Sequence, residues 1–391
     1  MITLGATIIV IGVIVFIHEL GHYLAARLSG IRVEKFSVGF PPRFITFTSV
    51  ENGWDIHLYF FRRSDNGKTE WGPVWNRTFS ARKRKGSNTE YCLALIPFGG
   101  YVKMAGIIDE SMDMSITHAP DEFMSKSSLT QIFVMSAGVI MNVLLAFVIL
   151  TGIAWNNGTP ELSNEPVIAR VIDNMPAKLE GMKVGDRILS INEQSIETWE
   201  ELSNIIHGLP NSLITLTYER DGKQYSKSLT TKFQPALING KIDTLGAIGI
   251  IQEYTMLPIG FVEALKSGLV STIGGFELMI VSIKMLVTGE ASIKELGGPI
   301  MIAKMAGDSA RAGLGPLLYF MALISLNLAL LNILPIPGLD GGHIFITLIQ
   351  MIIRRPISTN TRLAIQKIGL ALILLLMITV FINDIGRIIS N

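Results

Sequence analysis

The stretch Phe16-Ile17-His18-Glu19-Leu20-Gly21-His22 determines how the rest of this chain is interpreted. It reads H-E-x-x-H. On a helix, His18 and His22 lie one turn apart on the same face, where both imidazoles can bind one metal ion. Glu19 lies beside them, placed to take a proton from water that the metal activates. The motif continues an apolar run that begins at Ile2. Ionisable side chains are costly in a membrane-spanning segment, so the pattern favours a functional site.

The composition is more apolar than that of a typical soluble protein. Of 391 residues, 49% are hydrophobic and 17% are charged, whereas soluble proteins have about 25% charged residues. The net charge of +1 provides no concentrated basic surface, so we expect no nucleic-acid partner. Cys92 is the only cysteine, which excludes an internal disulfide and a cysteine metal cluster. The N-terminal run lacks a basic n-region and a small-residue cleavage site, and we expect a retained helix rather than a signal peptide.

Four apolar segments are expected to cross the membrane as helices, since about 20 apolar residues span the hydrocarbon core. They are residues 1–28, 129–155, 316–350 and 363–383, and prolines and glycines break the third after residue 334. Basic residues concentrate after the first and third segments: Arg43, Arg62, Arg63, Arg77, Arg82-Lys83-Arg84-Lys85, Lys103, Arg354, Arg355, Arg362 and Lys367. By the positive-inside rule, these parts are cytoplasmic and both termini lie outside.

Residues 29–128 predict a membrane-associated β region. Val33–Phe47 and Trp54–Phe61 are rich in β-branched and aromatic residues and are expected to be strands. Pro97–Gly106 is apolar and bracketed by glycines, which predicts a short strand with a close backbone approach. This strand is either an ordinary hairpin edge or a membrane-inserted edge that pairs with an extended substrate.

Residues 160–252 alternate apolar and polar positions and resemble a PDZ domain. The signature is a Pro176-Ala177 helix, a glycine, and then Gly-Asp-x-Ile-x-x-Ile-Asn at residues 185–192. Such a domain either offers a peptide-binding groove or acts as a steric spacer. Residues 258–312 follow, and their charged residues and glycines predict amphipathic helices on the membrane surface.

A catalytic zinc site needs a third protein ligand and one open position. Asp340 is the best candidate, because the expected topology brings it to the cytoplasmic side together with the H-E-x-x-H motif. His343 is a rival that we place beside the site rather than in it. The other histidines are expected at the surface, namely His57, His118 and His207. Asn142 needs a polar partner in lipid, Gly138 is interpreted as a helix-packing residue, and Asp384 has no partner that the sequence identifies.

Taken together, the chain resembles the site-2 protease family of intramembrane zinc metalloproteases, in its bacterial regulator-of-sigma-E branch. The motifs that carry this resemblance span nearly the full length. They are H-E-x-x-H, Gly-Gly-Tyr-Val-Lys-Met-Ala-Gly at 99–106, Gly138-x-x-x-Asn142, the PDZ signature, Gly298-Pro299 and Asn332-x-x-Pro335-x-x-x-Leu339-Asp340-Gly341. Some relatives have two PDZ domains in tandem, whereas this chain has room for one.

The resemblance implies a polytopic α-helical membrane protein with four transmembrane helices, a membrane-associated β region and one extracytoplasmic PDZ domain. It implies a bacterial inner-membrane protease that cuts single-span membrane proteins within their transmembrane segments, such as anti-sigma factors or signal-peptide remnants. Zn²⁺ would be held by His18, His22 and Asp340, with Glu19 as general base. The implied substrate contacts are Gly99, Gly100, Tyr101, Val102, Lys103, Met104, Asn142 and Asn332. A zinc-dependent transporter or sensor and a non-catalytic PDZ scaffold remain as alternatives.

Overall fold

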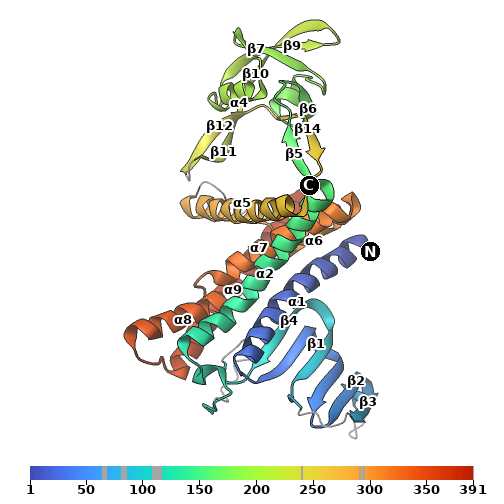
Figure 1. The fold of residues 1–391 in the computed structure, drawn as a ribbon, viewed down its shortest axis with the longest axis vertical. Coiled ribbons are helices and arrows are strands. Elements are labelled where there is room, and N and C mark those ends of the chain that lie inside the picture. Colours follow the sequence, from blue (N-terminus) through green and yellow to red (C-terminus); the bar gives the residue numbers. More distant parts are fainter. Residues whose placement is uncertain are drawn as a thin grey trace. The chain divides into compact units, whose positions relative to one another are not determined.

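The computed structural model describes residues 1–63, 68–80, 86–107, 117–238, 241–289, 292 and 296–390. The chain forms two compact units. The first combines Met1–Gly152 with Gly268–Asn391, and the second is Ile153–Ser267. The first contains the long helices and a β-sheet (Figure 1). The basic run at 82–85 lies outside the described residues, as do residues 293–295 of the segment expected to form membrane-surface helices.

Long apolar helices dominate the first unit, as expected of a multi-pass membrane protein. Within the described ranges, five helices are long and apolar enough to cross a membrane: α1 (Ile2–Leu28), α2 (Ser128–Asn157), α5 (Phe261–Thr288), α7 (Leu314–Ile333) and α9 (Thr359–Ser390). Two shorter helices accompany them, α6 (Pro299–Ala312) and α8 (Asp340–Ile353). All four segments expected to span the membrane are helical, and the third is interrupted between α7 and α8.

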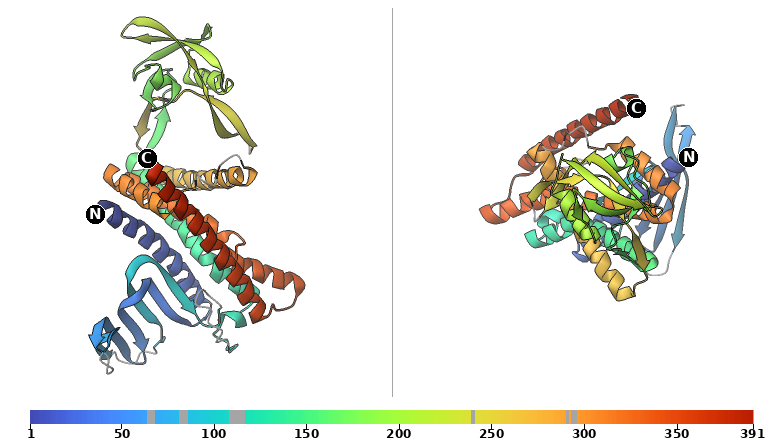
Figure 2. Two further views of the ribbon diagram at one scale, coloured as in Figure 1. Left: turned by 180° about the vertical axis from the view of Figure 1, so that it is seen from behind. Right: turned by 90° about the horizontal axis from the view of Figure 1, so that it is seen from above.

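Helix α5 is the additional candidate span, in a segment expected to lie on the membrane surface. Its length and hydropathy also suit a crossing, so the expected number of four spans stays a prediction. Residues 268–288 of α5 lie across α2 rather than along it (Figures 1 and 2). Close contact is possible there because a Cβ at Gly268 would lie 2.1 Å from Oγ1 of Thr151.

The long helices pack through apolar side chains and small residues. Ala6, Val10 and Ile14 of α1 are buried in one cluster with residues of α6 and α7. Helices α1 and α2 touch at the backbone, since a Cβ at Gly21 would lie 2.4 Å from the carbonyl oxygen of Ala137. Small residues permit such close approach between membrane helices. This contact sets the position of the H-E-x-x-H motif along the axis of α2.

The β region is a four-stranded sheet in the order β3-β2-β1-β4. Its strands are β1 (Val33–Val50), β2 (Gly53–Arg63), β3 (Thr69–Ser80) and β4 (Glu90–Met104). The two expected strands lie within β1 and β2, and the expected short strand at 97–106 is the end of β4, which stops at Met104. Phe36 pairs with both Tyr91 and Val102 of β4. Residues 33–38 therefore lie between the two halves of β4, which leaves residues 100–104 at the edge of the described sheet.

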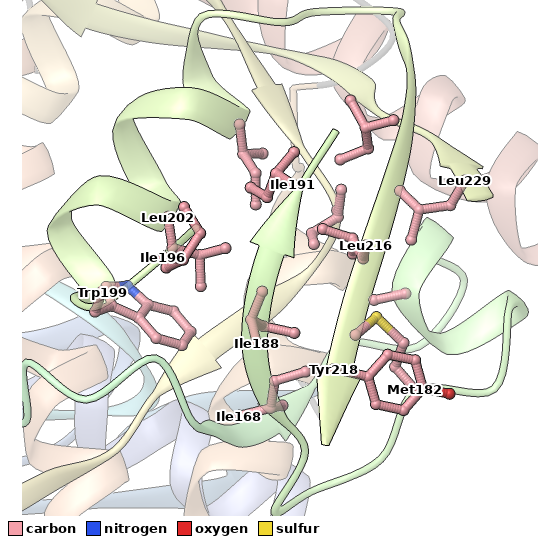
Figure 3. Close-up of a cluster of buried hydrophobic side chains, with 14 residues drawn as sticks. Ile168, Met182, Ile188, Ile191, Ile196, Trp199, Leu202, Leu216, Tyr218 and Leu229 are labelled. Atoms are coloured by element: carbon pink, nitrogen blue, oxygen red, sulfur yellow. The ribbon is translucent and has the colours of Figure 1, made fainter. Parts of the chain in front are cut away.

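The second unit is a small α/β domain that agrees with the expected PDZ signature. Its main sheet has the order β10-β9-β7-β8 and its helices are α3 (Pro176–Leu179) and α4 (Trp199–His207). The strands are β5 (Thr159–Leu162), β6 (Ile168–Val171), β7 (Arg187–Ile191), β8 (Gln194–Ser195), β9 (Leu213–Arg220), β10 (Lys223–Thr230), β11 (Lys232–Ile238), β12 (Lys241–Ala247), β13 (Ile250–Gln252) and β14 (Tyr254–Leu257). Ile188 and Ile191 of the signature are buried beside Leu216 (Figure 3).

The signature's polar and glycine positions have structural roles. Asp186 is fully buried, and it accepts hydrogen bonds from the Lys183 backbone at 2.8 Å and from Arg220 Nε at 2.6 Å. The bond to Asp186 raises the pKa of the Arg220 guanidinium above its ordinary value. Gly181 and Gly185 adopt φ angles of 77° and 89°, which glycine reaches at low cost. The extracytoplasmic location of this domain stays a prediction.

Asp384, which had no partner from the sequence, caps the start of α6 from α9. Its Oδ1 accepts from the Gly298 backbone N–H at 3.0 Å, and its Oδ2 accepts from Ile300 and Met301 at 3.0 and 3.1 Å. The carboxylate is 3% exposed. It satisfies N–H groups that a helix N-terminus leaves without intrahelical partners.

We expect Asp384→Ala to destabilise the first unit by about 2 kcal/mol, at the upper end for loss of a helix cap, because three N–H groups would lose their acceptor. The midpoint of thermal unfolding in detergent would measure this. Asp308→Ala is the control, since Asp308 lies on α6 with a side chain 56% exposed. Equal midpoints for both variants would contradict the capping role.

Candidate metal centre

Three ligand-type atoms meet where α1 faces the start of α8. Nε2 of His18 lies 3.1 Å from Oδ2 of Asp340, and Nε2 of His22 lies 3.3 Å from the same oxygen. The two Nε2 atoms are 3.2 Å apart. Within the described residues, this is the group of histidine and acidic side chains that could hold a metal ion. The structure thus brings together two residues of one helix and a third more than 300 positions later in the chain.

The surroundings orient both imidazoles with Nε2 toward this point. Nδ1–H of His22 donates to the backbone carbonyl of Val134 at 2.9 Å, so the neutral ring presents an unprotonated Nε2. The side-chain amide of Asn142 lies 3.2 Å from Nδ1 of His18. Oδ1 of Asn142 has no hydrogen-bond partner, and turning the amide by 180° would offer it Nδ1–H of His18. Such outer partners fix the tautomer of metal-binding histidines.

The break between α7 and α8 carries Asp340 into the site. Residues 334–339 separate the two helices, and Asp340 is the first residue of α8. The turn is tight, because a Cβ at Gly341 would lie 2.1 Å from the carbonyl oxygen of Leu334. Gly338 has a φ of 93°, which suits glycine. Prolines and glycines in this stretch therefore end one helix and begin the next at the depth of the histidines.

Gly138 of α2 lies directly against the histidine pair. A Cβ there would lie 2.5 Å from Nε2 of His22 and 2.7 Å from Cε1 of His18. The sequence interpretation as a helix-packing residue is incomplete, because only a residue without a side chain leaves the two imidazoles in place. No local signal in the sequence connects Gly138 with residues on α1.

We expect Gly138→Ala to weaken zinc binding by about 10- to 100-fold, the usual range when the groups around metal ligands are disturbed. The added methyl group would push at least one imidazole away from Asp340. Competition with a fluorescent zinc chelator would measure the affinity. Gly152→Ala is the control on the same helix, since a Cβ at Gly152 meets nothing within 4 Å. Similar affinities for both variants would rule out this role.

Glu19 lies between the histidines in sequence and faces the edge strand. A Cβ at Gly100 would lie 3.7 Å from Cγ of Glu19. The edge residues alternate, with Val102 and Met104 buried and Tyr101 and Lys103 half-buried. Lys103 pairs with Glu34 at 3.4 Å. The structure thus places the half-buried Glu19, which follows the ligand-type residue His18 in sequence, beside the backbone of Gly100.

The other polar residues singled out in the sequence divide into two groups. Asn332 belongs to the site, since its Nδ2 lies 3.2 Å from Nε2 of His18. His343 lies outside it, and its Nε2 is 3.0 Å from Nε2 of Gln366. The remaining histidines are elsewhere: His118 and His207 are exposed, and His57 is half-buried on β2.

The residues fit a zinc ion. Ligand atoms about 2.0–2.2 Å from zinc at tetrahedral angles lie roughly 3.3 Å from one another, and the three observed separations are 3.1, 3.2 and 3.3 Å. Oδ2 of Asp340 is buried and has no hydrogen-bond donor, which is costly for a carboxylate oxygen unless a cation binds there. Fold and site together define a multi-pass membrane protein with a metal centre of two histidines and one aspartate.

Comparison with known proteins identifies the family. The sequence profile of Peptidase family M50 matches residues 6–71 and 77–376. A Clostridium acetobutylicum protein, whose name describes it as a candidate zinc metalloprotease, is 32% identical over 97% of this chain and 96% of its own length. The regulator of sigma-W protease RasP of Bacillus subtilis is 30% identical over 98% of each chain. This chain therefore belongs to Peptidase family M50, the site-2 protease family of zinc metalloproteases.

Among solved structures, the PDZ domain of the SdrC-like protein of Listeria innocua matches 23% of this chain and 93% of its own. The identity is 22% and the TM-score is 0.19. The PDZ assignment for residues 160–252 therefore rests on the sequence signature and on the topology of the second unit.

Proposed function

We propose that this metalloprotease hydrolyses peptide bonds within the transmembrane segments of single-span membrane proteins. The observation that carries the proposal is the cluster of His18, His22 and Asp340, with Oδ2 of Asp340 3.1 and 3.3 Å from the two Nε2 atoms. The cluster lies on helices whose composition suits a membrane. Proteolysis at this depth would need both water and an unwound substrate.

Each residue of the site has a role in the proposed reaction. His18, His22 and Asp340 would hold the zinc ion, which when bound supplies Lewis-acid chemistry toward water and the scissile carbonyl. Glu19 would take a proton from the attacking water and return it to the leaving amine as the peptide bond breaks. Asn142, through its contact with Nδ1, would hold the imidazole of His18 in the orientation that presents Nε2 to the metal.

The edge strand would hold the substrate in an extended form. A peptide bond in a transmembrane helix is protected by internal hydrogen bonds, so the helix must unwind before cleavage. Residues Gly99, Gly100, Tyr101, Val102, Lys103 and Met104 offer backbone groups at the sheet edge, where an extended segment can add as a further strand. Gly100 lies beside Glu19, so the paired segment would pass the general base. Asn332, beside His18, would contact it near the scissile bond.

The family and the proposed location support a proposed substrate class. The name of the Bacillus subtilis relative connects that protein with sigma-W, and we propose anti-sigma factors or signal-peptide remnants as substrates here. The protein would reside in a bacterial inner membrane, with both termini and the PDZ domain outside. The basic residues after α1 and α8 support this orientation. The PDZ domain would admit substrates already shortened on their outer side.

Metal removal tests the proposal directly. The purified full chain in detergent would be mixed with a tagged single-span reporter, treated with a zinc chelator and then resupplied with Zn²⁺. We expect cleavage to stop and then to return, and mass spectrometry of the fragments should place the cut within the apolar segment. Undiminished cleavage after zinc removal, or a cut only in the flanking soluble parts, would refute the proposed function.

A further inference from the structure

A cavity lies beside α1, nearer to the N-terminus of this helix than the metal cluster. This cavity of about 240 Å³ opens between α1 and the bends of β1 and β4. Its walls include Ile8, Gly12 and Val13 of α1 and Leu93, Pro97 and Gly99 of β4. Every lining residue is apolar, glycine or proline. None of these residues belongs to the metal cluster, and no pocket was predicted here from the sequence.

The cavity is continuous with the proposed substrate strand. Gly99 lines the cavity and directly precedes Gly100, the first paired residue of the edge at 100–104. Gly12 and Glu19 are seven residues apart, close to two full helical turns, so they lie on nearly the same face of α1 and about 10 Å apart along its axis. The strand follows this face: a Cβ at Gly12 would lie 3.8 Å from the carbonyl oxygen of Pro97, and a Cβ at Gly100 would lie 3.7 Å from Cγ of Glu19.

The volume and chemistry of the cavity suit one large apolar side chain. An apolar cavity of about 150 Å³ is enough to bind benzene, and this one is about 240 Å³. Side chains of a transmembrane substrate are mostly of this kind. Val13 and Leu93 are 37% and 47% exposed, so the cavity is open at its rim rather than sealed within the fold.

We propose that this cavity is a specificity pocket for an apolar side chain of the substrate. An extended chain advances about 3.3 Å per residue, so the 10 Å between Gly12 and Glu19 places the bound side chain about three residues from the scissile bond, on the extracytoplasmic side. The pocket selects substrates by side-chain volume at that position. This inference rests on the proposed function, because it needs a substrate held along the edge strand.

Filling the pocket tests the inference. The full chain in detergent would cleave single-span reporters that carry Ala, Leu or Phe at one scanned position at a time, with fragments mapped by mass spectrometry. We expect the wild type to prefer Leu or Phe over Ala about tenfold at the position that occupies the pocket, as one apolar group in a pocket allows. Gly12→Leu should remove this preference by slowing the Leu and Phe reporters and sparing the Ala reporter. Leu93→Ala should enlarge the pocket, and a further reporter with Trp at that position should then be cleaved faster than by the wild type.

Gly5→Leu is the matched control, because a Cβ at Gly5 of the same helix meets nothing within 4 Å. It should keep the wild-type preference, and zinc content would verify that each variant is folded. If Gly12→Leu slows all reporters equally, as displacement of a lipid chain would, the specificity pocket is refuted. Cleavage with no side-chain preference in the wild type refutes it as well. Failure of every reporter in the wild type would instead overturn the proposed protease function.

Discussion

Glu19→Gln is expected to reduce cleavage of a single-span reporter by about 10²- to 10⁴-fold, the range that a positioned general acid–base contributes, while zinc stays bound. The amide has nearly the shape of the carboxylate but cannot accept the proton of the attacking water. The three atoms that meet at the cluster belong to His18, His22 and Asp340, so the metal should be retained. Reporter cleavage and the zinc content of the same purified sample would be measured together.

The pair of readouts separates the classes of function considered for this chain. If the protein were a zinc transporter or sensor, the wild type and the variant would bind zinc equally, and neither would cleave the reporter. A non-catalytic PDZ scaffold would need neither bound zinc nor reporter cleavage for its function. Glu197→Gln makes the same chemical change at an exposed position in the second unit and should behave as wild type. Full cleavage by the Glu19 variant would overturn its assignment as general base.

The position of the cluster followed from sequence reasoning of two kinds. The spacing of His18 and His22 is local, and helix periodicity alone puts their rings together. Asp340 required a longer argument, in which the basic residues set the orientation of the helices and the run of prolines and glycines marked a break. Both arguments use properties that belong to short segments, and the structure brings the three side chains within 3.3 Å or less.

The features that the sequence did not reveal depend on contacts between distant segments. Gly138 has the pattern of a packing glycine, and its contact with two imidazoles arises only when α1 and α2 are in place. Asp384 pairs with backbone N–H groups more than 80 residues earlier. Backbone groups are present at every position, so no residue type marks them as partners. Capping across helices is therefore invisible in composition or periodicity.

The β region shows the same limit. The first two strands have runs of β-branched and aromatic residues and were predicted, whereas β3 contains Gly72 and Pro73, which weaken a strand pattern. The insertion of residues 33–38 between the two halves of β4 depends on bends in both strands. Alternation of residues predicts strands but not this order. The edge position of residues 100–104, on which the proposed substrate binding depends, therefore emerges only from the pairing.

Asp340→Asn is expected to lose both zinc and cleavage. The change replaces the one anionic ligand of the cluster with a neutral amide, and a neutral amide is a poor zinc ligand beside two imidazoles. Loss of a ligand should exceed the roughly 10- to 100-fold weakening typical of disturbing the groups around it. Metal analysis of the purified protein and reporter cleavage would be compared with those of the wild type.

His343→Ala provides the decisive contrast, because His343 was the rival third ligand and lies three residues later on α8. Its Nε2 is 3.0 Å from Nε2 of Gln366, whereas Oδ2 of Asp340 is 3.1 Å from Nε2 of His18. The His343 variant should therefore retain zinc, and its cleavage should persist at a level set by how well α8 keeps its place. The opposite result, zinc lost with His343→Ala and kept with Asp340→Asn, would exchange the two assignments and require a different rotation of α8. Because the two residues lie on one helix, a general disturbance of α8 would affect both variants, and only a difference between them identifies the ligand.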